Sequence, residues 1–241
     1  MKVILPAVFW LAVWWIAAAA IRQSLLIPTP PEVLLRLGEL AATAPFWRYT
    51  ALSLLRITLG CVAGILLGIL TAAATYRFSW AETILAPAIR VIRATPVASF
   101  IILVLLWVKT GCVPGVISAM VVLPVIWESV TAGLRAVDPL LVEFARSYRL
   151  RSGAVLRHIY LPAVRPSLSA GVCTAIGLAW KSGVAAEVLC LPKAAIGTQV
   201  YYSKLYLESP SLFAWTIVVV VLSMALEALA KRLLKLGGTE T

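Results

Sequence analysis

Charged residues are scarce in this sequence. They make up 13% of its 241 residues, whereas 62% are hydrophobic. Soluble domains carry about 25% charged residues, so the composition excludes a soluble domain and predicts an all-α polytopic membrane protein embedded in a lipid bilayer. The apolar runs use up most of the chain and leave no stretch for a separate soluble domain. We therefore expect residues 1–241 to form a single membrane domain.

The residues of most catalytic and metal sites are also missing. His158 is the one histidine, which excludes a multi-histidine metal site, and no bound metal is expected. There is no Gly-x-x-x-x-Gly-Lys-Ser/Thr phosphate loop, and no Ser/His/Asp set or paired-carboxylate site suggests itself, so we expect neither an ATP site of that kind nor an enzyme. The cysteines lack paired metal-ligand spacing and are expected to be packing residues without disulfides: Cys61, Cys112, Cys173 and Cys190.

The net charge of +11 can indicate nucleic-acid binding. Here the basic residues flank apolar runs, as in cytosolic loops of membrane proteins, and no nucleic-acid partner is expected. With the N-terminus inside, the inner segments hold Lys2, Arg77, Arg90, Arg93, Arg135, Arg146, Arg149, Arg151, Arg157, Arg165, Lys231, Arg232 and Lys235. The outer segments hold the smaller set, Arg22, Arg36, Arg48, Lys109, Lys193 and Lys204. Both termini are therefore predicted to be cytosolic.

The apolar runs predict about six transmembrane helices. They are Val3–Ile21, Thr50–Ala74, Pro96–Val108, Val116–Leu134, Leu168–Leu191 and Leu212–Ala230. The first run also has features of a signal peptide, but it is longer than a typical signal core, which favours a retained helix. Between the second and third runs, Tyr76–Ala94 is expected to be a loop.

Glycine recurs at every fourth position of the second run. Gly60, Gly64 and Gly68 form one stripe, which Ala72 continues. A stripe of small residues lets another helix approach closely, so these glycines predict helix packing rather than chemistry.

A basic, polar stretch, Asp138–Pro166, separates the fourth and fifth runs. Asp138 can cap a helix that starts at Pro139. In that helix an apolar face is predicted from Leu141, Phe144, Ala145 and Tyr148. Ser152 can cap a second short helix that ends before Pro162. The stretch is thus a cytosolic helix-turn-helix that needs a partner to bury its apolar faces.

Part of this stretch resembles a known signature. Glu143-Phe144-Ala145, a turn at Arg149 and then Ile159-Tyr160-Leu161-Pro162 resemble the EAA loop of permease subunits in binding-protein-dependent ABC importers, the MetI-like family. Phe144 replaces the first Ala of the family pattern, and Arg149 replaces its Gly. The bend then falls either at Arg149 or at Gly153. The alternative to the signature is an ordinary charged loop between membrane helices.

The resemblance implies a permease subunit with a family core at about 50–232 and an extra N-terminal helix at about 3–21. It implies an inner-membrane location, a second permease copy, an external solute-binding protein and an ATPase subunit that holds the ATP. No cofactor would bind this chain itself. In the coupling loop, Glu143 and Ala145 would touch the ATPase, and Arg146 and Arg149 could pair with acidic groups at the rim of that contact. Ile159, Leu161 and Pro162 complete the signature.

Two short segments resemble one branch of that family, the nitrate/sulfonate/taurine permeases. They are Arg93-Ala94-Thr95-Pro96 and Ala186-Glu187. The branch resemblance implies a small anion such as nitrate, a sulfonate or taurine, or a pyrimidine-type vitamin precursor. It also implies a homodimer, because a single permease type is usual there.

Besides Arg56 and Glu227, which lie toward the ends of their runs, three charged residues fall inside predicted spans: Glu128, Lys181 and Glu187. Charge at membrane depth is costly, so such residues face a cavity or each other. One interpretation is a substrate pathway in which Lys181 attracts an anion and Trp180 stacks on it. The other is a structural ion pair, in which Lys181 could meet Glu128 on the neighbouring helix.

Two further classes of function need no ATPase partner. The first is a secondary transporter or a polytopic membrane enzyme, and the second is a structural membrane anchor. Genes for an ATPase and a binding protein beside this one would favour the importer over both.

Overall fold

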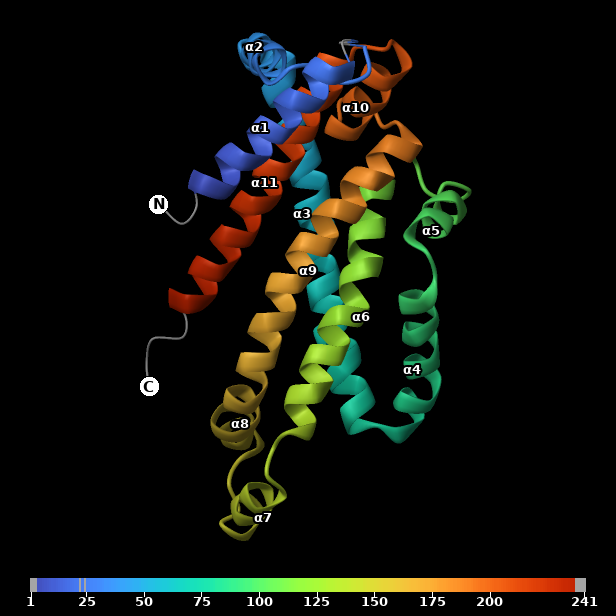
Figure 1. Ribbon diagram of the computed structural model, residues 1–241. Helices are drawn as coiled ribbons and strands as arrows, with labels where there is room; N and C mark the ends of the chain where they lie inside the picture. Colours follow the sequence, from blue (N-terminus) through green and yellow to red (C-terminus); the bar gives the residue numbers. More distant parts are fainter. Residues whose placement is uncertain (1–3, 22, 24, 237–241) are drawn as a thin grey trace. The chain divides into compact units, whose positions relative to one another are not determined.

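A computed structural model describes residues 4–21, 23 and 25–236, and in these residues it contains helices and no strands. The helices are α1 (Ile4–Ile21), α2 (Pro30–Ala41), α3 (Ala44–Arg77), α4 (Ser79–Ala94), α5 (Val97–Val104), α6 (Val113–Arg135), α7 (Pro139–Ser147), α8 (Ser152–Val155), the π-helix η1 (Leu156–Tyr160), α9 (Leu161–Cys190), α10 (Ile196–Leu205) and α11 (Ser209–Leu236) (Figure 1). The all-α prediction is confirmed. Lys2, Val3 and Arg22, which entered the span and charge predictions, lie outside the described residues.

Fewer helices than predicted are long and apolar enough to cross a membrane by themselves. In the described part of the chain there are four: Ala44–Arg77, Val113–Arg135, Ser152–Cys190 and Ser209–Arg232. A fifth span results if α4 and α5, which meet at an angle of 107°, count as one broken span. The apolar part of the first helix, Val8–Ile21, is shorter than these.

The prediction of a loop at Tyr76–Ala94 is wrong. Most of it is α4, a helix that buries Ala81, Ala86 and Ile89 and contacts α6. Arg90 and Arg93, which the expected loop contained, lie on this helix. The prediction of a third span at Pro96–Val108 is also wrong, because the helix there, α5, ends at Val104.

Pro96 explains the break between α4 and α5. Its ring favours extended backbone in the preceding residue, and Thr95 has φ −80° and ψ 132°. The chain therefore leaves the helix at Thr95 and starts again at Val97.

Two compact units divide the chain. The first comprises Met1–Leu55 and Glu187–Leu222, and the second comprises Arg56–Ala186 and Ser223–Thr241. In the first unit Trp14 of α1 stacks on Phe213 of α11, with ring centroids 5.7 Å apart. The Trp14 Nε1–H also donates a hydrogen bond of 3.1 Å to the carbonyl of Pro28. Helix α1 is thus packed against the start of α11.

The glycine stripe of α3 lies against α6 in the second unit. A Cβ atom at Gly60 would be 2.0 Å from the carbonyl oxygen of Gly115, and one at Gly64 would be 2.7 Å from that of Ala119. A Cβ at Gly68 would be 2.7 Å from the Cβ of Ile126. Only glycine permits this approach along the stripe.

Helix α9 packs on α6 in the same unit. The Ser118 hydroxyl of α6 donates a 3.1 Å hydrogen bond to the carbonyl of Ala179. A Cβ at Gly171 of α9 would lie 2.2 Å from the Ser129 hydroxyl oxygen of α6. Helix α6 is therefore held between α3 and α9 by close backbone approaches. None of the four cysteines, all of which are in the described part of the chain, is in a disulfide.

We predict that Gly60→Ala destabilises the protein, because its methyl group would collide with backbone rather than with a movable side chain. Overpacking of this kind costs about 1–3 kcal/mol. The thermal unfolding midpoint of the detergent-solubilised protein measures the effect. The control is Gly38→Ala in α2, where a Cβ meets nothing within 4 Å. Equal midpoints for the two variants would contradict the close contact between α3 and α6.

Candidate translocation pocket and coupling surface

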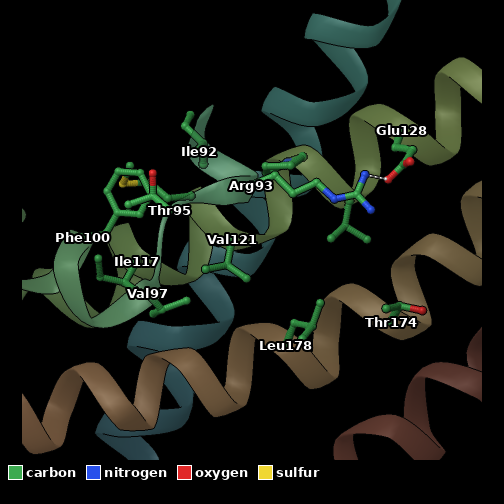
Figure 2. Close-up of a pocket in the computed structure, with 13 residues that line it drawn as sticks. Ile92, Arg93, Thr95, Val97, Phe100, Ile117, Val121, Glu128, Thr174 and Leu178 are labelled. Atoms are coloured by element: carbon green, nitrogen blue, oxygen red, sulfur yellow. Dashed lines mark hydrogen bonds and ion pairs between the residues drawn. The ribbon is translucent and has the colours of Figure 1, made fainter. Parts of the chain in front are cut away.

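A pocket of about 380 Å³ opens between the junction of α4 and α5, helix α6 and helix α9. Its lining is mostly apolar and comprises Ile92, Arg93, Thr95, Val97, Phe100, Ile117, Met120, Val121, Pro124, Val125, Glu128, Thr174 and Leu178. The break at Pro96 places the end of α4 and the start of α5 on the same cavity. Figure 2 shows Leu178 of α9 pointing toward the side chains from the other helices.

One ion pair supplies the charges of this pocket. Arg93 Nη1 lies 2.5 Å from Glu128 Oε2, and the two side chains are 64% and 55% exposed (Figure 2). The expected contact of Glu128 with Lys181 is therefore wrong, since the partner of Glu128 is Arg93 on α4. Sequence reasoning missed Arg93 as a pocket residue because it assigned the whole segment before Pro96 to a cytosolic loop.

Lys181 and Trp180 have different surroundings, although they are neighbours on α9. Trp180 is 1% exposed and is part of the packed core, so it is not open to a ligand. Lys181 is exposed. It follows Leu178 by one helical turn and Thr174 by two, which places it on the same face of α9 as the pocket lining.

Glu187 does not line the pocket, and its side chain is fully buried in the first unit. Its Oε2 accepts hydrogen bonds from the Ser53 hydroxyl, at 2.9 Å, and from the backbone N–H of Gly197, at 3.0 Å. The Ser53 oxygen in turn accepts one from the N–H of Ile196, at 2.9 Å.

This network joins the end of α9 to α3 and to the first turn of α10. A carboxylate beside the N-terminus of a helix is also favoured by the helix dipole. The arrangement is that of a structural anchor. Glu187 thus lies in a buried hydrogen-bond network, whereas Glu128 lines the pocket and is in an ion pair with Arg93.

The start of the coupling loop has the predicted cap. Asp138 Oδ1 accepts a 2.8 Å hydrogen bond from the N–H of Leu140, and Pro139 occupies the first position of α7. Figure 1 shows α7 beyond the end of α6. Glu143 and Arg146 are exposed on α7.

The apolar face of α7 differs from the predicted one. Ala145 is 2% exposed and lies against the rest of the unit, whereas Leu140, Phe144 and Tyr148 are 70%, 57% and 68% exposed. The rings of Phe144 and Tyr148 contact each other with centroids 4.4 Å apart. Ala145, which was expected to touch a partner, is therefore covered by this chain itself, and the aromatic side chains Phe144 and Tyr148 are the exposed ones.

The bend after α7 falls at Arg149 and not at Gly153. Arg149 has a φ of 51°, and no glycine in the described part of the chain has a positive φ. The N–H of Leu150 donates to the carbonyl of Ala145 at 2.9 Å, and the N–H of Arg149 donates to that of Arg146 at 3.0 Å. These two bonds form a Schellman motif, in which glycine usually occupies the position held by Arg149.

The second half of the loop is continuous with α9. The N–H of Leu161 bonds to the carbonyl of Leu156, which closes the π-helical turn directly before Pro162. Ile159 is half-buried, Leu161 is 60% exposed and Pro162 is exposed. A cavity of about 570 Å³ lies between this region, α7 and the end of α3, and Ala145, Arg146, Ser152 and Tyr160 contribute to its lining.

Known proteins resemble the chain over most of its length. The family described as "Binding-protein-dependent transport system inner membrane component" matches residues 64–235. The taurine transport system permease protein TauC of Escherichia coli K12 is 27% identical over 234 residues, covering 92% of this chain and 85% of that protein. The putative aliphatic sulfonates transport permease protein SsuC of the same strain is 29% identical over 181 residues, covering 74% and 68%.

Solved structures share the fold. A bacterial ABC transporter involved in the import of the acidic polysaccharide alginate has a TM-score of 0.67 at 15% identity, covering 97% of this chain and 94% of that one. An amino acid ABC transporter has a TM-score of 0.60 at 22% identity, covering 78% and 93%.

The turn at Arg149 generates a prediction for the coupling loop. A left-handed conformation costs a residue with a Cβ about 1–2 kcal/mol. Replacing that residue by glycine removes this cost, but the larger backbone entropy that glycine loses on folding offsets part of the gain in stability. Arg149→Gly should therefore stabilise the end of α7 by about 1 kcal/mol, which slows amide hydrogen exchange there by about fivefold. Arg149→Ala, which also removes the guanidinium but keeps the Cβ, should not slow it. Equal exchange rates in the two variants would show that charge, and not the turn, controls this end of the helix.

Proposed function

The chain belongs to the family of binding-protein-dependent transport system inner membrane components, and on this premise we propose that it conducts a small organic anion past the α4–α6–α9 pocket. It is the transmembrane permease subunit of an ABC importer, a multi-pass inner-membrane transport subunit and not an enzyme. Membership of the family implies an ATPase partner and a binding protein.

The exposed aromatic face of α7 is the observation that carries the coupling role. Leu140, Phe144 and Tyr148 stand on a helix capped at both ends, so they form a defined surface rather than a mobile loop. A desolvated aromatic cluster is the usual centre of a protein interface. We assign this surface to the ATPase subunit, which holds the ATP, with Glu143 and Arg146 at the rim of the contact.

The exposed ion pair supports a second permease copy. Glu128 lies within the span Val113–Arg135, about 10 Å along the axis from its end. Lipid does not solvate a charge at such a depth, so this face must adjoin protein or a water-filled cavity. In a homodimer whose two copies face each other with α4, α6 and α9, this face adjoins both protein and a water-filled cavity. We also place α7 and both termini on the cytosolic side, because the distribution of arginine and lysine in the sequence favours this orientation.

The basic residues at and beside the pocket favour a substrate with an anionic group. Arg93 lines the pocket, and Lys181 continues the α9 face one turn beyond Leu178. The sulfonate groups of taurine and of aliphatic sulfonates, named for two relatives, can pair with these basic residues, which an uncharged pyrimidine-type vitamin precursor cannot do. Nitrate also fits by charge, but it would leave most of the apolar lining without contacts.

Co-purification of the ATPase tests the coupling surface. With the chain as bait in solubilised, crosslinked membranes, we expect the ATPase to be captured by the parent and lost from Phe144→Asp and Tyr148→Asp. The matched control is Trp107→Ala, an exposed aromatic in the segment between α5 and α6, with a relative exposure of 78%. It should retain the ATPase.

Capture by all the variants would place the contact elsewhere on the chain. A parent that captures no ATPase would contradict the coupling role.

A further inference from the structure

The cavity beside α7, of about 570 Å³, has no role in the proposed function. We propose that it binds an anionic phospholipid, with the lipid phosphate on Arg77 and Arg146 and the acyl chains along the apolar lining. This site shares no residue with the α4–α6–α9 pocket. The proposal does not depend on which solute the chain transports.

The cavity lies where three candidate membrane spans end. Arg77 is the last residue of α3, Leu134 is next to the last residue of α6, and Ser152 begins the span that continues into α9. All three residues line the cavity. The ends of membrane spans lie at the boundary between the hydrocarbon core and the headgroups. A ligand in this cavity is therefore at the depth of the lipid phosphates.

The lining carries two positive charges and no carboxylate. Arg77 and Arg146 are exposed, and in the described part of the chain neither is in an ion pair. Arg77 stands over the ring of Phe78, 5.3 Å from its centroid, and this contact leaves the guanidinium N–H groups available. Guanidinium groups pair with phosphate through two parallel hydrogen bonds. Basic pockets between the ends of membrane helices bind anionic headgroups in this way.

The rest of the lining favours a lipid over a free phosphate. Most of it is apolar, and Leu150 and Leu156 are 48% and 57% exposed. A free phosphate would leave these side chains without contacts, whereas acyl chains cover them. The hydroxyls of Tyr76 and Tyr160, whose rings lie 6.0 Å apart, can donate to the ester oxygens of a lipid.

The lipid and the ATPase would occupy different faces of α7. Val142, Ala145 and Arg146 line the cavity. The exposed rings of Phe144 and Tyr148 point roughly 130° away from them around the helix axis. Both partners can therefore be bound at once. A phosphate held by one arginine of α3 and one of α7 ties the coupling helix to the end of the membrane helices.

Photocrosslinking tests the site in the full-length protein in phosphatidylcholine nanodiscs. The discs contain a trace of phosphatidylglycerol or of phosphatidylcholine, each with a photoreactive acyl chain, and mass spectrometry measures the label on the cavity peptides. Labelling of the exposed apolar residues Val220, Val221 and Met224 of α11 is the reference for unselective contact. Relative to it, we expect phosphatidylglycerol to label the cavity about tenfold more than phosphatidylcholine.

Three substitutions identify the charge that is responsible. Arg77→Gln should lower the preference for phosphatidylglycerol by about fivefold, whereas Arg77→Lys keeps the charge and should retain most of it. The matched control is Arg157→Gln, which removes an exposed arginine of η1 that does not line the cavity. It should keep the parental preference.

The same cavity preference for both lipids in the parent would overturn the proposal, and so would an unchanged preference in Arg77→Gln. Displacement of the label by inorganic phosphate would show a site for soluble anions and would overturn the lipid assignment.

Amide hydrogen exchange tests the tie between α7 and α3. In the parent, exchange in α7 should be slower in nanodiscs that contain phosphatidylglycerol than in pure phosphatidylcholine. In Arg77→Gln the two lipids should give the same rate. A parent whose α7 exchanges at one rate in both lipids would contradict the tie.

Discussion

The close contact of α3 with α6 is the constraint on which the rest of the structure depends. Glycines of the α3 stripe bring the two backbones together, and a Cβ at Gly60 would be 2.0 Å from the Gly115 carbonyl oxygen. On its other side, α6 is held by α9 through Ser118 and Gly171. The 23 residues of α6, about 35 Å in length, thereby act as one rigid element that carries Glu128 within the span and leads directly into α7.

This continuity gives the coupling loop a mechanical route to the pocket. A short linker joins Arg135 at the end of α6 to Asp138, the cap of α7. The loop then returns through η1 into α9, which contributes Thr174 and Leu178 to the pocket. A partner that moves α7 therefore acts on two of the helices that line the pocket. Packed helices shift as bodies rather than bend continuously, so the pocket can switch between discrete states.

The sequence predicts those features that depend on local chemistry. Asp138 and Pro139 start α7 where the capping rules place them, and the all-α membrane class follows from composition. The predictions from sequence are wrong where tertiary packing decides whether a segment is helical or which of its side chains are buried. A loop was expected before Pro96 because arginines are common in loops, yet Arg93 sits on α4 and pairs with Glu128. Ala145 was expected at the partner surface, but a helical face alone does not say which side meets the bundle. Positive φ at Arg149 could be inferred only from the glycine that it replaces.

The central claim is that the pocket opens in response to α7. A single cysteine at Thr174, in a chain whose four cysteines are replaced, reports the side from which the pocket is accessible to a membrane-impermeant thiol reagent. With the ATPase and binding protein present in vesicles, labelling should move from one side of the membrane to the other when a non-hydrolysable ATP analogue is added. In the Phe144→Asp background the labelled side should not change. Labelling that is independent of nucleotide in the parent, or a change of side that persists in Phe144→Asp, would contradict the account.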